Sequence, residues 1–95
     1  MGRKIYRNRK ILNHPSIEIS SNEKVWKNMP LTTSPNNKHN YKPLNDSLYK
    51  GQKKKSYVQK NVRQDPLRTR GKQIKKFQLS KRDEKLIDNL SNKKH

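Results

Sequence analysis

The sequence predicts a mostly irregular, extended chain with a few short α-helices and no independent globular core. Only 26% of the 95 residues are hydrophobic, and 25 Lys and Arg stand against 7 Asp and Glu, which gives a net charge of +18. Low hydrophobicity combined with a large single-sign charge is typical of chains that become ordered mainly on a partner. Such a charge favours a polyanion as that partner. Because the chain contains no Cys, a disulfide framework and a thiolate zinc site are excluded.

Residues 1–13 are predicted to form a basic N-terminal arm. They contain several cations and no acid, interspersed with apolar residues such as Ile5 and Leu12. The arm is either a helix laid along a phosphate backbone or a solvated, frayed terminus, and we favour contact with phosphates. The candidate phosphate-binding residues of this arm are Arg3, Lys4, Arg7, Arg9 and Lys10.

Residues 14–30 are the least basic and most apolar stretch, and they predict a short docking segment. Ile17 and Ile19 alternate with polar residues, as expected of a short strand. A Ser-x-x-Glu capping box begins at Ser20, and it predicts a helix over 21–29.

The predicted helix carries one apolar stripe centred on Trp26. A helix this short is not stable alone in water, and Trp is enriched at the energetic centres of interfaces. We therefore expect the stripe to dock onto a protein neighbour. The alternative is a local cluster closed within the chain. The candidate docking residues are Ile17, Ile19, Val25, Trp26 and Met29.

Residues 31–52 have the Pro- and Asn-rich composition of a polar linker. Within it, Leu44 and Leu48 are four positions apart and predict a helix over 44–50. Ser34 precedes a proline and is a candidate phosphorylation site, where added phosphate would weaken polyanion binding. An ordinary Ser-Pro turn is the alternative and the more common case.

Residues 53–79 are predicted to be the main RNA-binding segment. Aromatic side chains lie among the cations, and this interleaving suits phosphates together with unstacked bases. Gly71 lies in an Arg-rich run and permits close approach of a backbone. The alternative is a solvated charge run without a ligand. The candidate RNA-binding residues are Lys53, Lys54, Lys55, Tyr57, Lys60, Arg63, Arg68, Arg70, Lys72, Lys75, Lys76 and Phe77.

Residues 80–95 predict a short amphipathic helix followed by a basic tail. Ser80 begins a second cap, and the helix is expected over 81–91, with acids in its first turn that complement the helix dipole. Its apolar stripe packs either on Trp26 within the chain or on another protein, and we favour the second. The stripe consists of Leu86, Ile87 and Leu90.

Catalytic and metal-binding chemistry is not indicated. His14, His39 and His95 lack metal-ligand spacing, and the sequence has no P-loop or glycine-rich nucleotide motif. We therefore predict no enzyme activity, cofactor, metal or small-molecule substrate. The apolar runs are too short for a signal-peptide core or a bilayer span, so no membrane partner is expected.

The charge distribution favours an RNA-binding, and in particular an rRNA-binding, structural or assembly component of a large ribonucleoprotein, with protein neighbours as further partners. A DNA- or chromatin-binding protein is one alternative, although no recognition helix is evident. An interaction adaptor without nucleic-acid contact is another. Basic runs suited to nuclear import favour the nucleus and nucleolus, with the mitochondrion or the cytoplasmic ribosome as alternatives.

Overall fold

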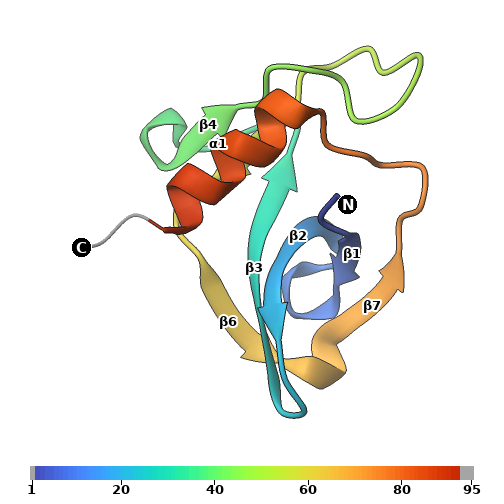
Figure 1. Ribbon diagram of the computed structural model, residues 1–95, viewed down its shortest axis with the longest axis vertical. Coiled ribbons are helices and arrows are strands. Elements are labelled where there is room, and N and C mark those ends of the chain that lie inside the picture. The colour runs from blue at the N-terminus through green and yellow to red at the C-terminus, as the bar shows by residue number, and fades with distance from the viewer. Residues whose placement is uncertain (1, 93–95) are drawn as a thin grey trace.

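Seven antiparallel strands and one α-helix make up the computed structural model, which describes residues 2–92 (Figure 1). The strands are β1 (Ile5–Asn8), β2 (His14–Ser21), β3 (Val25–Thr32), β4 (Tyr41–Pro43), β5 (Tyr57–Gln59), β6 (Arg63–Pro66) and β7 (Arg70–Gln73). The helix α1 spans Lys81–Ser91. Three short 3-10 helices complete the structure: η1 (Arg9–Ile11), η2 (Lys38–Asn40) and η3 (Leu67–Thr69).

Strand β3 organises the sheet. It continues the antiparallel meander of β1 and β2, in which Ile17 pairs with Ile5 on one side and Met29 on the other. The other edge of β3 is shared, because its first half pairs with β6 and its last residues pair with β5. Strand β4 pairs with β5, and β7 pairs with β1. Only η3 separates β6 from β7, so the end of β6 and the start of β7 lie close together at the bottom of Figure 1. The sheet is therefore strongly curled.

The prediction of an extended chain without its own core is wrong. The Cα radius of gyration is 12.4 Å, close to the value expected for a folded domain of this length and far below the roughly 30 Å of an unfolded chain. The five segments distinguished by composition all contribute to this one unit. The tail residues 93–95 of the last segment lie outside the described residues.

The apolar core lies between one face of the sheet and α1. Side chains alternate along a strand, so the paired residues Ile5, Ile17 and Met29 point to the same side. Ile87 of α1 is completely buried in the same cluster. The core consists of Ile5, Ile17, Met29, Leu31, Leu44, Leu48, Val58, Ile74 and Ile87.

The opposite face of the sheet is also buried, but polar residues surround its one large apolar side chain, Trp26. The indole Nε1 donates a hydrogen bond to Thr69 Oγ1 at 3.0 Å, and the edge of the ring system meets Tyr6 with 6.2 Å between centroids. Asn8 and Asn28 are completely buried on this side. Hydrogen-bonded polar side chains thus fill a second interior, which is why the low hydrophobic fraction underestimates the capacity of the chain to fold.

The predicted helix over 21–29 is wrong, because these residues form a hairpin turn and the start of β3. Asn22 Oδ1 accepts hydrogen bonds from the backbone N–H of Lys24 at 2.7 Å and of Val25 at 2.9 Å, which closes the turn. Val25 and Trp26 favour strands, and β2 and β6 supply hydrogen-bonding partners on both sides. The long-range pairing outweighs the capping-box pattern.

The other predicted elements have different outcomes. The strand inferred from the alternation of Ile17 and Ile19 is confirmed within β2. The helix over 44–50 is wrong, because this stretch is an irregular loop. The helix over 81–91 is confirmed as α1, and Ser80 Oγ caps it by accepting a hydrogen bond from the backbone N–H of Asp83 at 3.2 Å.

Candidate nucleic-acid interface

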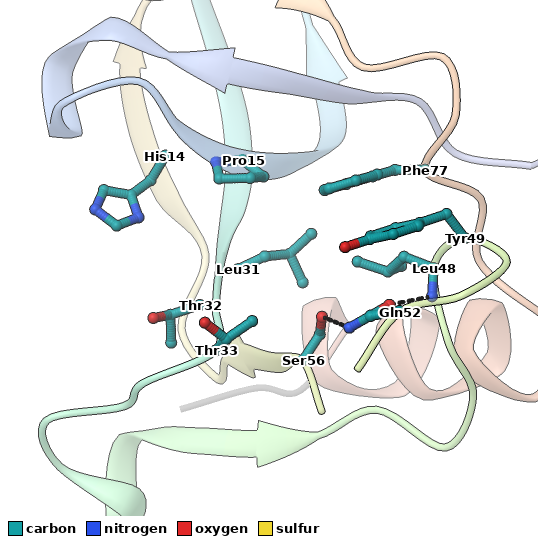
Figure 2. A pocket seen from close by; sticks show the side chains of 10 residues that line it. All are labelled: His14, Pro15, Leu31, Thr32, Thr33, Leu48, Tyr49, Gln52, Ser56 and Phe77. Atoms are coloured by element: carbon teal, nitrogen blue, oxygen red, sulfur yellow. Dashed lines mark hydrogen bonds between the residues drawn. The ribbon is translucent and has the colours of Figure 1, made fainter. Parts of the chain in front are cut away.

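A cavity of about 220 Å³ opens between the end of β3, the start of β2 and the irregular segment 44–56 (Figure 2). We call residues 44–56 the pocket loop. The loop contributes one side of the cavity, and Phe77, from the stretch between β7 and α1, lies beside it. The lining residues are His14, Pro15, Leu31, Thr32, Thr33, Leu48, Tyr49, Gln52, Ser56 and Phe77.

Two aromatic rings form an apolar wall of the cavity. Tyr49 and Phe77 stack with 5.3 Å between their centroids and 6° between their planes. The Lys76 ammonium lies 4.7 Å from the centre of the Tyr49 ring, within the range of a cation–π contact. Both rings are half-buried, so they contact solvent as well as the core. Planar rings beside a cation are a combination that binds unstacked nucleic-acid bases.

Polar groups lie across the cavity from these rings. Figure 2 shows His14 on the other side of Leu31 from the ring pair, with Thr32 and Thr33 nearby. The Gln52 amide is already used: its Oε1 accepts from the backbone N–H of Leu48 at 2.7 Å, and its Nε2 donates to Ser56 Oγ at 2.7 Å. Gln52 therefore shapes the loop, whereas the exposed His14 and Thr33 are accessible to a ligand.

Lysines line three hollows that adjoin the cavity. Each of these hollows shares lining residues with the cavity and therefore adjoins it. The second hollow shares Gln52 and Ser56, the third shares Leu48 and Tyr49, and the fourth shares Phe77. The lysines that line them are Lys53, Lys54 and Lys55 in the second, Lys50 and Lys76 in the third, and Lys4 and Lys75 in the fourth. The aromatic wall thus lies next to lysine-lined surface.

The chain uses its arginines and lysines differently. Every ion pair among the described residues has an arginine as its cation: Arg3 with Glu84 and Asp88, Arg63 with Asp65, Arg70 with Glu18, and Arg82 with Asp46. No lysine of residues 2–92 forms one. Because most of the few acids are consumed by arginines, the lysine charges remain available for an external anion.

Three of the arginines predicted to bind RNA instead make contacts within the protein. Arg3 ties the N-terminus to α1, Arg63 enters a buried network, and Arg70 lies over the Tyr6 ring at 4.7 Å. Each is at most half-exposed. Part of the positive charge counted in the sequence is therefore neutralised by ion pairs within the fold.

The buried network centres on Asp65, whose side chain is 4% exposed. Its carboxylate accepts hydrogen bonds from Asn8 Nδ2 and Asn28 Nδ2, each at 3.0 Å, and from Arg63 Nε at 2.8 Å. Burial alone would raise the pKa of Asp65, but the hydrogen bonds from Arg63, Asn28 and Asn8 outweigh it and lower the pKa to about 2. Asp65 is thus an ionised structural group.

Other predicted RNA-binding residues lie away from the cavity lining. Arg7, in β1, donates a hydrogen bond to the backbone carbonyl of Asn13 and Arg9, in η1, donates one to that of Arg68, each at 3.2 Å. Tyr57 is half-buried in β5. The remaining members are exposed: Lys10, Lys60, Arg68 and Lys72. Ser34 is exposed at a bend just after β3, and its modification stays a prediction.

The predicted protein-docking residues point into the chain. Trp26, Met29, Ile17 and Ile87 are completely buried, and a side chain held in the interior cannot anchor a partner. The more peripheral members Ile19, Leu86 and Leu90 pack against the same core, and Val25 is half-buried. Both stripes are therefore internal, but neither forms the cluster with Trp26 that the sequence offered as the alternative to docking, because Ile17 and Ile19 belong to the core on the other face of the sheet. The helix stripe does not meet Trp26, which faces the other side of the sheet.

Sequence reasoning found Phe77 but missed Tyr49, His14 and the two threonines as members of one site. Tyr49 and Phe77 are far apart in the chain and stack only because the pocket loop folds back, so no local pattern signals the pair.

No family model, curated protein or solved structure matches the chain. Within residues 2–92, no helix is long and apolar enough to cross a membrane, and no three potential metal ligands of the His, Cys, Asp or Glu type lie together.

Proposed function

We propose that the chain binds single-stranded RNA as a structural or assembly component of a ribonucleoprotein. The observation that carries the proposal is the set of lysines without ion pairs in the hollows that adjoin the cavity with its stacked Tyr49 and Phe77 side chains. The lysines neutralise backbone phosphates while the cavity receives one unstacked base. The binding unit is a folded surface, in place of the extended basic threads that the sequence favours.

Electrostatics supply most of the affinity in this proposal. Each lysine that neutralises a phosphate releases a counterion, so the logarithm of the binding constant falls with the logarithm of the salt concentration by about 0.7 per contact on a single strand. Lysines already engaged with carboxylates would release fewer counterions. The pairing of acids with arginines therefore favours a steep salt dependence.

The geometry favours RNA over the two alternatives. A duplex-DNA reader needs an exposed recognition element, whereas α1 packs one face on the core and uses its first-turn acids internally. The adaptor alternative depends on two apolar stripes, and these stripes are buried. RNA also offers 2′-hydroxyl groups to polar side chains such as His14 and Thr33 at the rim of the cavity.

Ribosomal RNA is the RNA that we propose, with the nucleolus as the compartment. The assignments to ribosomal RNA and to the nucleolus rest on the charge excess and on the exposed Lys53–Lys55 run, which suits nuclear import. Crosslinking in cells followed by sequencing of the bound RNA tests them. Enrichment of ribosomal reads supports the assignment, and enrichment of DNA or of unrelated transcripts contradicts it.

Fluorescence anisotropy with a labelled single-stranded RNA of about ten nucleotides tests the binding proposal over a salt series. The variant Lys53→Gln/Lys54→Gln removes two charges beside the cavity, and Lys24→Gln/Lys27→Gln removes two near the β2–β3 turn at the other end of β3. The first should weaken binding and lower the salt slope by about 0.7 per lost contact. The second should change both much less.

Single-stranded DNA of the same sequence and double-stranded RNA are the competing ligands. Equal affinity for the DNA would contradict recognition of RNA, and tighter binding of the duplex would contradict a pocket for an unstacked base. The same samples, run on a denaturing gel, test the prediction that the protein is not an enzyme. Intact RNA agrees with a binding role, and cleavage that requires the folded protein overturns it.

A further inference from the structure

The pocket loop contains one wall of the proposed base site yet has little regular structure. Its ends are joined by one backbone hydrogen bond from Leu44 N to Ser56 O at 2.9 Å, its middle is held by one from Gln78 N to Leu48 O at 2.9 Å, and Gln52 N donates to Tyr49 O at 3.3 Å within it. Between these tethers lies Tyr49. A loop with so few backbone partners needs other contacts to hold a ring in a fixed place.

Gln52 supplies some of these contacts from within the loop, and Asp83 of α1 supplies others from outside it. The Asp83 side chain is completely buried, and its Oδ1 accepts hydrogen bonds from Asn45 N at 2.7 Å and from Asn45 Nδ2 at 3.0 Å. Its Oδ2 accepts from Asp46 N at 3.0 Å. Both carboxylate oxygens are thus aimed at the start of the pocket loop, and charge-assisted bonds of this kind are among the stronger ones in proteins.

The second ring lies in the stretch that leads into the same helical turn. Phe77 lies three residues before Ser80, and Ser80 Oγ accepts the backbone N–H of Asp83 at 3.2 Å. The first turn of α1 therefore holds the start of the pocket loop through the Asp83 carboxylate, and the residue after Phe77 is tied to the same loop by the bond from Gln78 N to Leu48 O. Figure 1 shows α1 lying across the end of the sheet next to β4, where the pocket loop begins.

A neighbouring ion pair cannot take over this role. Arg82 pairs with Asp46 at 2.6 Å, but the Arg82 side chain is 69% exposed. Exposed pairs contribute little to stability. The buried Asp83 side chain therefore anchors the loop, whereas the Arg82 side chain is exposed to solvent.

We propose that Asp83 is the positioning residue of the RNA site: by anchoring the pocket loop it keeps Tyr49 stacked on Phe77 before RNA arrives. The inference rests on the proposed function. A preorganised site binds more tightly because less conformational entropy is lost on binding. The role of α1 is then to brace the base pocket without contacting RNA through an exposed face.

The test compares Asp83→Asn with Asp88→Asn, which makes the same change of charge on the same helix but removes the ion pair with Arg3. Three quantities are measured on the full chain: hydrogen exchange of the pocket loop, affinity for a single-stranded RNA containing 2-aminopurine, and the salt slope. For Asp83→Asn we expect faster exchange over 44–56, about tenfold weaker binding with less quenching of the fluorescent base, and an unchanged salt slope because the lysines remain. For Asp88→Asn we expect loop exchange and quenching as in the wild type.

Faster loop exchange with unchanged RNA affinity and quenching would show that Asp83 only stabilises the fold, and the inference would be wrong. If Asp83→Asn does not fold, Asn45→Ala removes one of the three hydrogen bonds and should weaken binding about two- to threefold with the same loop signature. Unchanged binding by that variant would equally contradict the inference. Failure of the wild-type chain to bind any RNA would instead overturn the proposed function, and the exchange data would still show whether Asp83 anchors the loop.

Discussion

Replacing Asp65 with Asn should destabilise the fold through the buried polar interior. The carboxylate accepts four hydrogen bonds, from Asn8, from Asn28 and two from Arg63. An Asn oxygen in the place of Oδ2 keeps three of them, but its NH2 group then faces the Arg63 Nη2 donor, which stands 3.0 Å from Oδ1 in the wild type. One charge-assisted bond is lost and two donors are opposed, which together cost about 3 kcal/mol.

The same residue predicts an acid-dependent loss of stability. The pKa of Asp65 is lowered from 3.8 to about 2 in the folded chain, so the unfolded chain binds more protons between these values. The stabilisation, about 2 kcal/mol, is complete above roughly pH 4 and is lost as the pH falls through about 2. Asp65→Asn should lack this part of the acid sensitivity.

Urea unfolding reports both effects, with fluorescence of Trp26 as the probe, because it is the one Trp of the sequence and is completely buried. A cooperative transition is expected at pH 7, with a lower midpoint for Asp65→Asn. A loss below 1 kcal/mol at pH 7, together with an acid profile equal to that of the wild type, would refute the assignment of the network as a structural interior.

Three further substitutions test the packing, each by urea unfolding followed by circular dichroism, because Trp26→Phe removes the fluorescent probe. Gly71→Ala should destabilise the chain by about 1–3 kcal/mol, because an added Cβ would lie 2.9 Å from the Arg7 carbonyl oxygen in β1; wild-type stability would contradict this close approach. Leu12→Gly should stabilise it by about 0.5–1 kcal/mol, since Leu12 is 87% exposed with a φ of 59°, and a destabilised variant would contradict this. Trp26→Phe removes the buried bond to Thr69 and should cost about 2 kcal/mol with unchanged RNA affinity, whereas a selective loss of RNA binding would make Trp26 part of the site.

Local signals in the sequence predict some elements and not others. Helix α1 has a Ser cap, acids in its first turn and an apolar stripe, and these features agree with one another and with the fold. The segment that forms the start of β3 has a capping-box pattern as well, but it pairs with the preceding strand β2 and also with β6, which is distant in sequence. Long-range pairing of this kind leaves no local signature, which is why the helix expected there is a strand.

The hydrophobic fraction of the sequence underestimates the core for a related reason. Counting hydrophobic residues treats Asn8, Asn28 and Asp65 as surface, although they satisfy one another inside the curled sheet. The candidate site is predicted in part: the cations and Phe77 are recognised from their interleaving, whereas Tyr49 joins them only through tertiary contacts with the pocket loop. Whether a cation is used inside the fold depends on partners that can be distant in sequence. Glu84, for example, contacts Arg3 from 81 positions away.

The central claim is that one RNA base enters the cavity beside the stacked rings. Photocrosslinking of the full chain to a short single-stranded RNA with one 4-thiouridine, followed by mass spectrometry of the crosslinked peptides, tests it most directly. We predict that the crosslinks fall on Tyr49, Phe77 or His14 and are competed by unlabelled single-stranded RNA. Crosslinks confined to the β2–β3 turn, or spread over the lysines without preference for the cavity, would contradict the claim.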